Sequence, residues 1–530
     1  MRIDLNTGSA QALGQMKYAT SVASNNINNA ANPYYARQTI VFTTNSAGVL
    51  TANPIRMSNA FLNQQMHTSN AEMASTGTVY SMAKSVDKVI TGISADADGG
   101  SSNALQQALS AINESLVSLA AEDSGAARTT FLSRLDSFFA TSQTMLGQLD
   151  DYKSKLNDDL SALVDNVNQS AQELARINDQ IRKNPKNNEA LLTQRDQLLG
   201  ELSQYTKIQV DEQENGTVVV RIAGGQELVN GNEYTPLTKS VNDDGSTSVF
   251  IHGVDLTKTP ERVGGALGGT VQAYNDIVSK TESQISHLMV GFAAAINEAN
   301  MQGYKPDGTA GGALIDIPTV SANGKSGNSG NGRLDISIDY KNLDNLSTGG
   351  FTMEVTSAGY EFYDESTGDS MVVTSFPAEV FGMTIDGAGS FDMGDKFEFN
   401  PVPEMAKGMS VTSSADDIAA AGNLPITAGD NQNLLNLSDV MSDKVFGDAT
   451  VVDHLGNVFV DIGNAAKSAE NAHKTATSIN TTAKAEWSNF SAVSTQEEEL
   501  NILKYQQIYN SVSKVIQTSK QMFDTLFNSI

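Results

Sequence analysis

The C-terminal stretch LKYQQIYNSVSKVIQTSKQMFDTLFNSI, residues 503–530, carries apolar residues at a regular helical spacing. Steps of three and four residues separate the members of this stripe, which are Tyr505, Ile508, Val512, Val515, Ser519, Met522 and Leu526. Such a narrow stripe is typical of a coiled-coil seam, because a helix on a globular domain buries a wider face. The stretch therefore predicts a C-terminal helix that packs along another helix through these side chains.

A similar seam lies near the N-terminus and runs into the segment SNNINNAANPYYARQ at residues 24–38. Its members are Leu13, Met16, Thr20, Ala23, Ile27 and Ala30. Pro33 ends this helix, because the residue before a proline is pushed out of the α region. Asn25 and Asn26 lie near that end, where Asn side chains bond neighbouring backbone groups. We expect the two terminal helices to pair with each other or with neighbouring subunits.

The middle of the chain alternates between helical seams and strand patterns. Further seams with the same spacing occur at residues 105–119, 131–149, 160–181, 271–299 and 452–476. Asn215-Gly216 and Gly224-Gly225 are each flanked by β-branched runs, which predicts two hairpins because both turns need positive φ. Residues 333–400 alternate between apolar and polar side chains, as strands do.

These patterns predict a multidomain protein of mixed α and β class. A discontinuous, coiled-coil-like helical core would come from both termini, and β-rich outer domains from the middle of the chain. The expected division is as follows: terminal helices at 1–37 and 500–530, a helical core domain at 38–200 and 441–499, and a β-rich outer region of one or two subdomains at 201–440, which contains a long helix at about 267–302.

The charge of the chain excludes two classes of partner. The 530 residues include 34 Lys and Arg against 61 Asp and Glu, a formal net charge of −27. Such a surface repels nucleic acid and anionic lipid, so we expect neither as a partner. The chain has no cysteine, no apolar run of about 18 residues and no readable signal peptide at its start. We therefore expect no membrane insertion, and any export by a route without a cleaved signal.

No group of residues has the spacing of a catalytic or metal site. None of the five histidines forms an HExxH motif, and no G-x-S-x-G nucleophile elbow occurs. The acidic segment SADADGG at 94–100 begins like a calcium loop but lacks the glutamate at position 12. The sequence predicts a protein without enzymatic activity, catalytic residues, cofactor, metal or small-molecule substrate.

Motifs at both ends resemble those of the flagellar rod, hook and hook-associated proteins. The C-terminal motif consists of Tyr505-Gln506-Gln507, Tyr509, Lys514-Val515-Ile516, Met522 and Asp524-Thr525-Leu526, after the acidic segment VSTQEEE at 493–499. The N-terminal motif consists of Ser24-Asn25-Asn26-Ile27, Asn29, Asn32-Pro33, Tyr35, Arg37 and Gln38.

Two interior segments, residues 191–229 and 264–314, narrow the resemblance to hook-associated proteins of the hook–filament junction. The chain departs from the family at Pro33-Tyr34-Tyr35, where Pro-Gly-Tyr is usual, so this turn lacks a residue that adopts positive φ freely. Residues 315–440 carry no motif that matches.

The resemblance implies a structural role. The terminal helices would lie side by side in the inner tube of the flagellum, and the chain would join the hook to the filament and be required for filament assembly. Implied partners are further copies of the chain in a ring, the hook protein, the next hook-associated protein on the filament side, and an export chaperone. The implied location is extracellular, in the flagellum, after export through the flagellar type III apparatus.

Two other functions fit the same patterns. The chain could be another axial flagellar protein, such as a hook protein or a flagellin, since the end motifs are shared among these proteins. It could also be a secreted adhesin-like binding protein, since exposed Gly- and Asn-rich strands can bind ligands.

Overall fold

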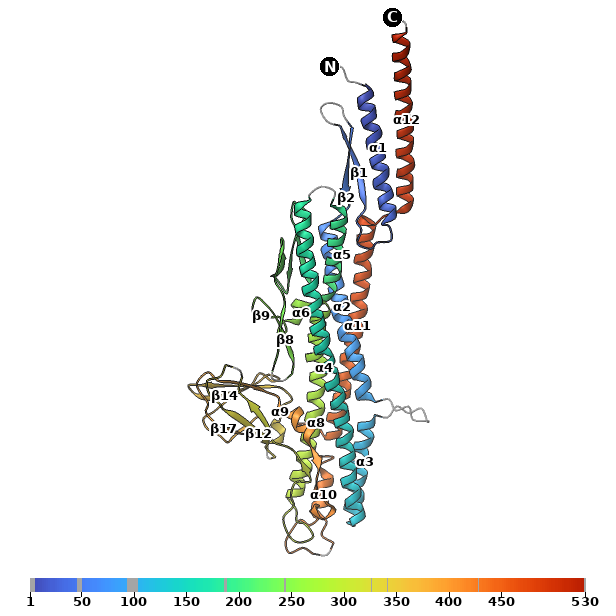
Figure 1. Ribbon diagram of the computed structural model, residues 1–530. Coiled ribbons are helices and arrows are strands. Elements are labelled where there is room, and N and C mark those ends of the chain that lie inside the picture. The colour runs from blue at the N-terminus through green and yellow to red at the C-terminus, as the bar shows by residue number, and fades with distance from the viewer. Residues whose placement is uncertain are drawn as a thin grey trace.

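The computed structural model describes residues 5–44, 50–92, 103–184, 188–242, 245–325, 327–340, 342–427 and 429–528. The protein is a long rod with both chain ends at one end of it (Figure 1). A β-rich body formed by residues near 320–400 projects from the side of the rod, closer to the opposite end. The mixed α and β class with long terminal helices is as expected from the sequence.

The helices form the length of the rod. They are α1 Leu5–Asn28, α2 Ala60–Thr91, α3 Ala104–Ala121, α4 Gly125–Lys183, α5 Glu189–Tyr205, α6 Pro260–Val263, α7 Gly265–Gln272, the π-helix Ala273–Ser279, α8 Lys280–Met301, α9 Pro401–Gly408, α10 Gln432–Asp439, α11 Val451–Ser491 and α12 Thr495–Phe527, with short 3₁₀ turns at Leu343–Asn345 and Ala415–Asp417.

The far half of the rod buries its seams almost completely. The side chains of the predicted seam at 105–119 are at most 2% exposed, and they pack against α4, where Phe131 and Phe138 are fully buried. A short turn joins α3 to α4, and the Ser124 hydroxyl caps α4 by accepting a hydrogen bond from the Ala127 N–H at 3.2 Å. Both seams are confirmed as helix–helix contacts inside the chain.

Helices α2 and α11 run antiparallel along the rod. The Trp487 Nε1–H donates to Asn63 Oδ1 at 2.9 Å, and Asn480 Nδ2 donates to Asn70 Oδ1 at 2.7 Å, so residue numbers rise in opposite directions. Asn480 and Asn70 are both buried, and each satisfies the other's polar group. This contact joins a segment near the N-terminus to one near the C-terminus.

The predicted helix at about 267–302 is present, with one difference. Residues Ala273–Ser279 are wound as a π-helix between α7 and α8, which a regular 3-4 spacing does not reveal. Helix α8 is buried on almost every side, and Phe292 packs against Phe138 with ring centroids 5.6 Å apart. This helix, which the sequence places within the outer region, therefore lies in the helical bundle.

Short strands after α5 form two small antiparallel sheets along the rod. Their strands are β3 Ile208–Glu212, β4 Val218–Ile222, β5 Gln226–Asn230 and β6 Glu233–Tyr234 in the first sheet, and β7 Thr238–Val241, β8 Thr247–Ile251 and β9 Val254–Asp255 in the second. Gly216 and Gly224 have φ of 82° and 78°, and they turn the chain between β3 and β4 and between β4 and β5. The two predicted hairpins are confirmed.

The projecting body contains two four-stranded sheets with the orders β11-β12-β17-β16 and β15-β14-β13-β18, and β10 pairs with β19 beside them. The strands are β10 Ile315–Asp316, β11 Val320–Asn323, β12 Arg333–Ile338, β13 Phe351–Thr356, β14 Gly359–Asp364, β15 Ser370–Val373, β16 Ala378–Val380, β17 Met383–Ala388, β18 Lys396–Phe399 and β19 Ser410–Val411. The buried carboxylate of Glu282 on α8 pairs with Lys407 on α9 at 2.6 Å and with Lys153 on α4, which ties the end of this segment to the bundle.

The region around residues 38–56 differs from the expected helical core domain. Strands β1 Gln38–Thr44 and β2 Leu50–Arg56 form a hairpin in register Gln38↔Arg56, and it packs against α1. Ala52 is the one buried residue of these two strands, so they carry no clear alternation of apolar and polar side chains, and the sequence pattern does not predict them. No helix in the part of the chain that is described is long and apolar enough to span a membrane.

Candidate assembly interface of the paired termini

The two chain ends form one unit, made of α1, the β1–β2 hairpin and α12, and we call it the terminal unit. Its small core consists of Met16, Ala19, Ala23 and Tyr505. The Tyr505 ring meets Phe42 of the hairpin edge-on at 5.9 Å between centroids, and Gln15 Oε1 accepts a hydrogen bond from the Ala52 N–H at 2.8 Å. The pairing of both termini with each other therefore occurs within a single chain.

The predicted interface residues of α1 differ in how far their side chains are buried. Met16 and Ala23 are buried, Leu13 and Ile27 are half-buried, and Asn25 is exposed. The buried side of α1 also includes two residues that the predicted seam omits, Ala19 and Val22. The buried face of α1 is therefore wider than the predicted seam, because Ala19 and Val22 lie beside its 3-4 spacing.

The predicted interface residues of α12 divide into two groups. Tyr505 is buried and Ile508 and Val512 are half-buried, whereas Val515 is 51% and Met522 62% exposed. The latter two therefore do not belong to the seam against α1, which corrects the continuous stripe expected from the spacing. The Leu526 side chain lies outside the described residues, as does the acidic segment at 94–100.

A larger apolar surface remains uncovered on α12. Besides Val515 and Met522 it includes Leu500, Leu503 and Phe523, which are 67%, 55% and 66% exposed. Five large apolar side chains on one exposed helix are more than the scattered single residues normal for a protein surface. This surface is the main candidate for contacts with other molecules.

Asn26, one of the predicted interface residues, connects the end of α1 to the start of β1 through side-chain hydrogen bonds. It is fully buried, its Nδ2 donates to the Gln38 carbonyl at 2.8 Å, and its Oδ1 accepts from the Tyr35 hydroxyl at 2.9 Å and from the Gln38 N–H at 3.0 Å. Burial raises the pKa of Tyr35 to about 12, so the hydroxyl keeps the proton that it donates. The Asn-rich segment thus fixes the reversal of the chain from α1 into β1.

Arg37 ties together the three chain segments that connect the terminal unit to the rod. Its N–H donates to the Ser491 carbonyl at 2.8 Å, and its own carbonyl accepts from the Met57 N–H at 2.8 Å. Its guanidinium pairs with Glu497 at 2.6 Å and with the buried Glu498 at 2.7 Å in the first turn of α12. Sequence analysis found both partners as family motifs but not their contact, because 460 residues separate them.

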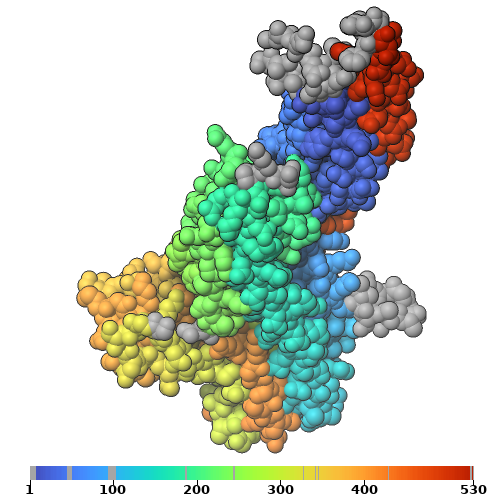
Figure 2. All heavy atoms as spheres, turned by 45° about the horizontal axis from the view of Figure 1, so that its top comes forward, coloured from blue at the N-terminus to red at the C-terminus, as the bar shows by residue number. Residues whose placement is uncertain are grey.

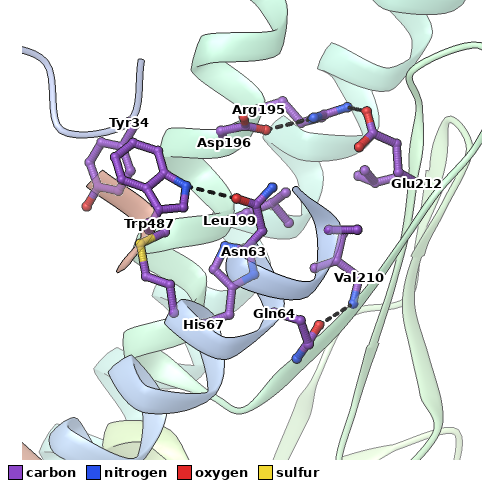
Figure 3. A pocket seen from close by; sticks show the side chains of 13 residues that line it. Tyr34, Asn63, Gln64, His67, Arg195, Asp196, Leu199, Val210, Glu212 and Trp487 are labelled. Carbon is purple, nitrogen blue, oxygen red and sulfur yellow. Dashed lines mark hydrogen bonds and ion pairs between the residues drawn. The ribbon is translucent and has the colours of Figure 1, made fainter. Parts of the chain in front are cut away.

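A recess lies beside this joint, between α2, α5 and the turn that carries Tyr34 (Figure 3). The Tyr34 ring packs on the α5 backbone at Gly200, where no side chain would fit. His67 lines the recess and is 4% exposed, and its Nδ1 has no hydrogen-bond partner. Burial, with the nearby Arg195, lowers the pKa of His67 to about 4, so the imidazole is neutral.

Charge is distributed very unequally between the terminal unit and the rest of the chain. Residues 1–59 and 492–530 hold seven basic and five acidic side chains, a net charge of +2. Residues 60–491 hold 27 basic and 56 acidic side chains, a net charge of −29. Copies of the chain repel each other along the rod and the β-rich body but not at the terminal unit.

The described residues show no arrangement suited to metal or acid–base chemistry. No group of three or more His, Asp or Glu side chains among them is placed to hold a metal ion. The closest histidine pair, His287 and His454, has ring nitrogens 3.4 Å apart, and His287 Nε2 also contacts the Leu346 carbonyl at 2.8 Å. Both rings pack on Phe446, which makes this pair part of the bundle core.

Comparison with known proteins gives a consistent result. The family described as the flagellar hook-associated protein FlgK helical domain matches residues 90–315. Flagellar hook-associated protein 1 of Salmonella typhimurium is 25% identical over 97% of this chain and 98% of its own length, and that of Escherichia coli K12 is 26% identical over the same shares.

The fold is also similar to that of a solved structure, the flagellar hook junction protein FlgK from Burkholderia pseudomallei. The TM-score is 0.69 at 18% identity, over 80% of this chain and 100% of that chain. The family match, the full-length relatives and the shared fold all agree with the motifs at the two termini. The chain is therefore similar over nearly its whole length to the flagellar hook-associated proteins.

Proposed function

We propose that this chain is a structural subunit of the bacterial flagellum that joins the hook to the filament and that filament assembly requires. Its full-length relatives carry the name flagellar hook-associated protein 1, and the solved structure of similar fold is that of a hook junction protein. In this role the chain binds other proteins and catalyses no reaction.

The observation that carries the proposal is the incomplete terminal unit. Its charge is near neutral, and α12 exposes Leu500, Leu503, Val515, Met522 and Phe523. Full burial of one such side chain stabilises a contact by about 1.5–3 kcal/mol. Stacking of terminal units from neighbouring subunits would bury this surface, while the acidic rods and β-rich bodies stay apart in the solvent.

The partners that we propose are those that the resemblance to the family implies. Copies of the chain form a ring through their terminal units, the hook protein lies on one side of the ring, and the next hook-associated protein lies on the filament side. Before assembly an export chaperone covers the apolar α12. The chain is exported through the flagellar type III apparatus and resides outside the cell, in the flagellum.

Removal of residues 500–530 tests the proposal. This truncation keeps Glu497 and Glu498, the ion-pair partners of Arg37, but it removes the exposed apolar surface of α12 together with Tyr505 of the terminal core. A deletion strain that carries the truncated chain should form bare hooks and release flagellin monomers into the medium. Circular dichroism of the purified product should show a folded rod.

The phenotype also separates the proposal from its alternatives. If these cells lack the hook itself, the chain is a hook protein. If their hooks carry all junction proteins but no filament subunits, the chain is a flagellin. Normal filaments on cells that carry the truncated chain would refute the role of the terminal unit. A variant with Asn510→Asp, a change at an exposed polar position of α12 outside the family motif, serves as the full-length control and should form filaments.

A further inference from the structure

The end of the rod opposite the chain termini displays an apolar surface on a rigid support. Three segments meet there: the end of α3, the loop after α8, and the loop that leads into α10, drawn in cyan, yellow-green and orange in Figures 1 and 2. Asn431 Nδ2 of the third segment donates to the Ala120 carbonyl of the first at 2.8 Å. We call this end the distal tip.

Five large apolar side chains of the distal tip are in solvent. They are Val117, Met301, Leu424, Ile426 and Leu435, which are 57%, 39%, 53%, 37% and 44% exposed. Leu424 and Ile426 flank the exposed Pro425, so three successive apolar residues stand at the end of one loop. A protein without a partner at this site would rarely place such a run in water.

The loop at 423–427 is held firmly at both of its ends. On one side the fully buried Asn300 binds the Ala419 N–H at 2.8 Å, and Tyr304 N–H donates to the Ala421 carbonyl at 2.8 Å. On the other side the fully buried Asn433 donates to the Ala419 carbonyl at 2.9 Å. The exposed side chains are therefore presented on a preorganised support, which lowers the entropy cost of binding.

The charge around this surface is strongly acidic. Residues 110–124, 300–313 and 414–442 hold eight acidic side chains and one basic side chain. The basic one, Lys305, already pairs with Asp417 at 3.7 Å. An apolar centre with an acidic border fits a partner whose contact face is apolar and bordered by lysine or arginine, since complementary charge favours encounter and like charge opposes it.

We propose that the distal tip docks a second, non-identical protein of the same flagellar assembly, with an apolar contact face and a basic border. Two tips of this chain repel each other, and so do the tip and the acidic rod of a neighbouring copy. The one part of this chain that is not acidic is the terminal unit, whose surface the proposed function already uses.

The proposal rests on the proposed function for its choice of assembly, and the test separates the two. A deletion strain would carry the full-length chain with a photo-crosslinking amino acid at position 424, or at position 241 as control. Val241 is 73% exposed on β7, away from the distal tip. Purified flagella would be irradiated, and adducts of the chain would be identified by mass spectrometry.

We expect an adduct between the chain and a different flagellar protein from position 424, at least fivefold more abundant than from position 241. Asp439→Lys, which reverses an exposed charge of the tip, should lower that adduct at least threefold, and Asp369→Lys on the β-rich body should not. Leu424→Glu combined with Ile426→Glu should weaken filament retention under shear, and Val241→Glu should not.

Adducts only between two copies of the chain, or no adduct from position 424 while the chain is present in the flagella, would overturn the docking proposal alone. An adduct that persists unchanged in the Asp439→Lys variant would overturn the basic border of the partner. Absence of the chain from purified flagella would overturn the proposed function, and the docking proposal with it.

Discussion

The seam of α3 in the rod and the seam of α12 in the terminal unit have the same 3-4 spacing but very different burial. All five seam residues of α3 are at most 2% exposed, because α4 and the bundle cover them. On α12, exposure rises from 8% at Tyr505 to 51% at Val515 and 62% at Met522. The spacing predicts that a helix packs against another helix, and only the structure shows whether that second helix belongs to the same chain.

The difference arises from what each seam meets. Helix α3 faces the large side chains of α4, such as Phe131 and Phe138. Helix α12 faces α1, which contributes Met16 and the small side chains of Ala19 and Ala23 to the shared core. One α1 with small side chains is too little to cover α12, so the seam is left for a neighbouring molecule.

The largest effect on folding should come from the rod. Phe138→Ala removes a fully buried ring that packs on Phe292, and we expect the free energy of unfolding to fall by about 3–5 kcal/mol. Phe523→Ala in the terminal unit is the matched control, because it removes a phenylalanine ring that is 66% exposed. This variant should change the free energy of unfolding by less than about 0.5 kcal/mol. Urea denaturation followed by circular dichroism measures both, and equal losses for the two variants would contradict the comparison.

The next effect concerns assembly. Ile508→Asp places a carboxylate in the half-buried seam of α12, where burial of an unpaired charge opposes contact with a neighbouring subunit, and we expect filament-bearing cells to fall at least thirtyfold. The urea midpoint of the monomer should stay within error of the parent, because the rod does not contain this residue. Electron microscopy of a complemented deletion strain gives the count.

Normal filament numbers for Ile508→Asp would show that the α12 seam is not needed in the assembly. A strongly lowered urea midpoint would instead show that the terminal unit supports the rod, which the separate cores of the two regions argue against.

The effect that is smallest at neutral pH is a pH dependence that one histidine of the rod contributes. All five histidines lie between residues 67 and 473, so the terminal unit has none. The pKa of His67 is about 4 in the folded chain and 6.5 when unfolded, so the unfolded state binds more protons between these values. Stability is therefore complete above pH 6.5 and falls as the pH drops towards 4, by about 1.4 kcal/mol per pH unit from this residue.

Thermal melts of the parent and of His67→Gln between pH 7 and 4.5 measure this effect. The variant should lose less stability as the pH falls. Arg195, Asp196 and Glu212 around the site are the same in both proteins, so the difference between them reports on His67. Parallel curves for the two proteins would mean that His67 is protonated in the folded chain.

Much of the fold could be predicted because local spacing controls it. The seams at 105–119 and 131–149 and the turns at Gly216 and Gly224 are local patterns, and the structure contains all of them. The sequence analysis does not predict the β1–β2 hairpin, whose strands alternate too weakly, or the π-helix Ala273–Ser279. A helix with one inserted residue keeps nearly the same apolar spacing as a regular one.

The candidate interface could be predicted only in part, for a similar reason. Tyr505 and Met16 were found because large apolar side chains carry the periodic signal, whereas Ala19 was not, because it lies beside the 3-4 spacing. The Arg37–Glu498 contact joins the two ends of the chain and leaves no local trace. Asn26 was identified as part of a motif, but its role in connecting α1 to β1 needed the positions of Tyr35 and Gln38, which only the folded chain supplies.

The most direct measurement uses the absence of cysteine from the sequence. Met522→Cys places the only thiol of the chain on the exposed surface of α12, and Val241→Cys places it on β7, where it is equally exposed in the monomer. Maleimide labelling should be rapid for both variants as purified monomers. In intact flagella we expect the thiol at position 522 to be protected at least tenfold while the thiol at position 241 still reacts; equal labelling at both positions would show that no neighbouring molecule covers α12.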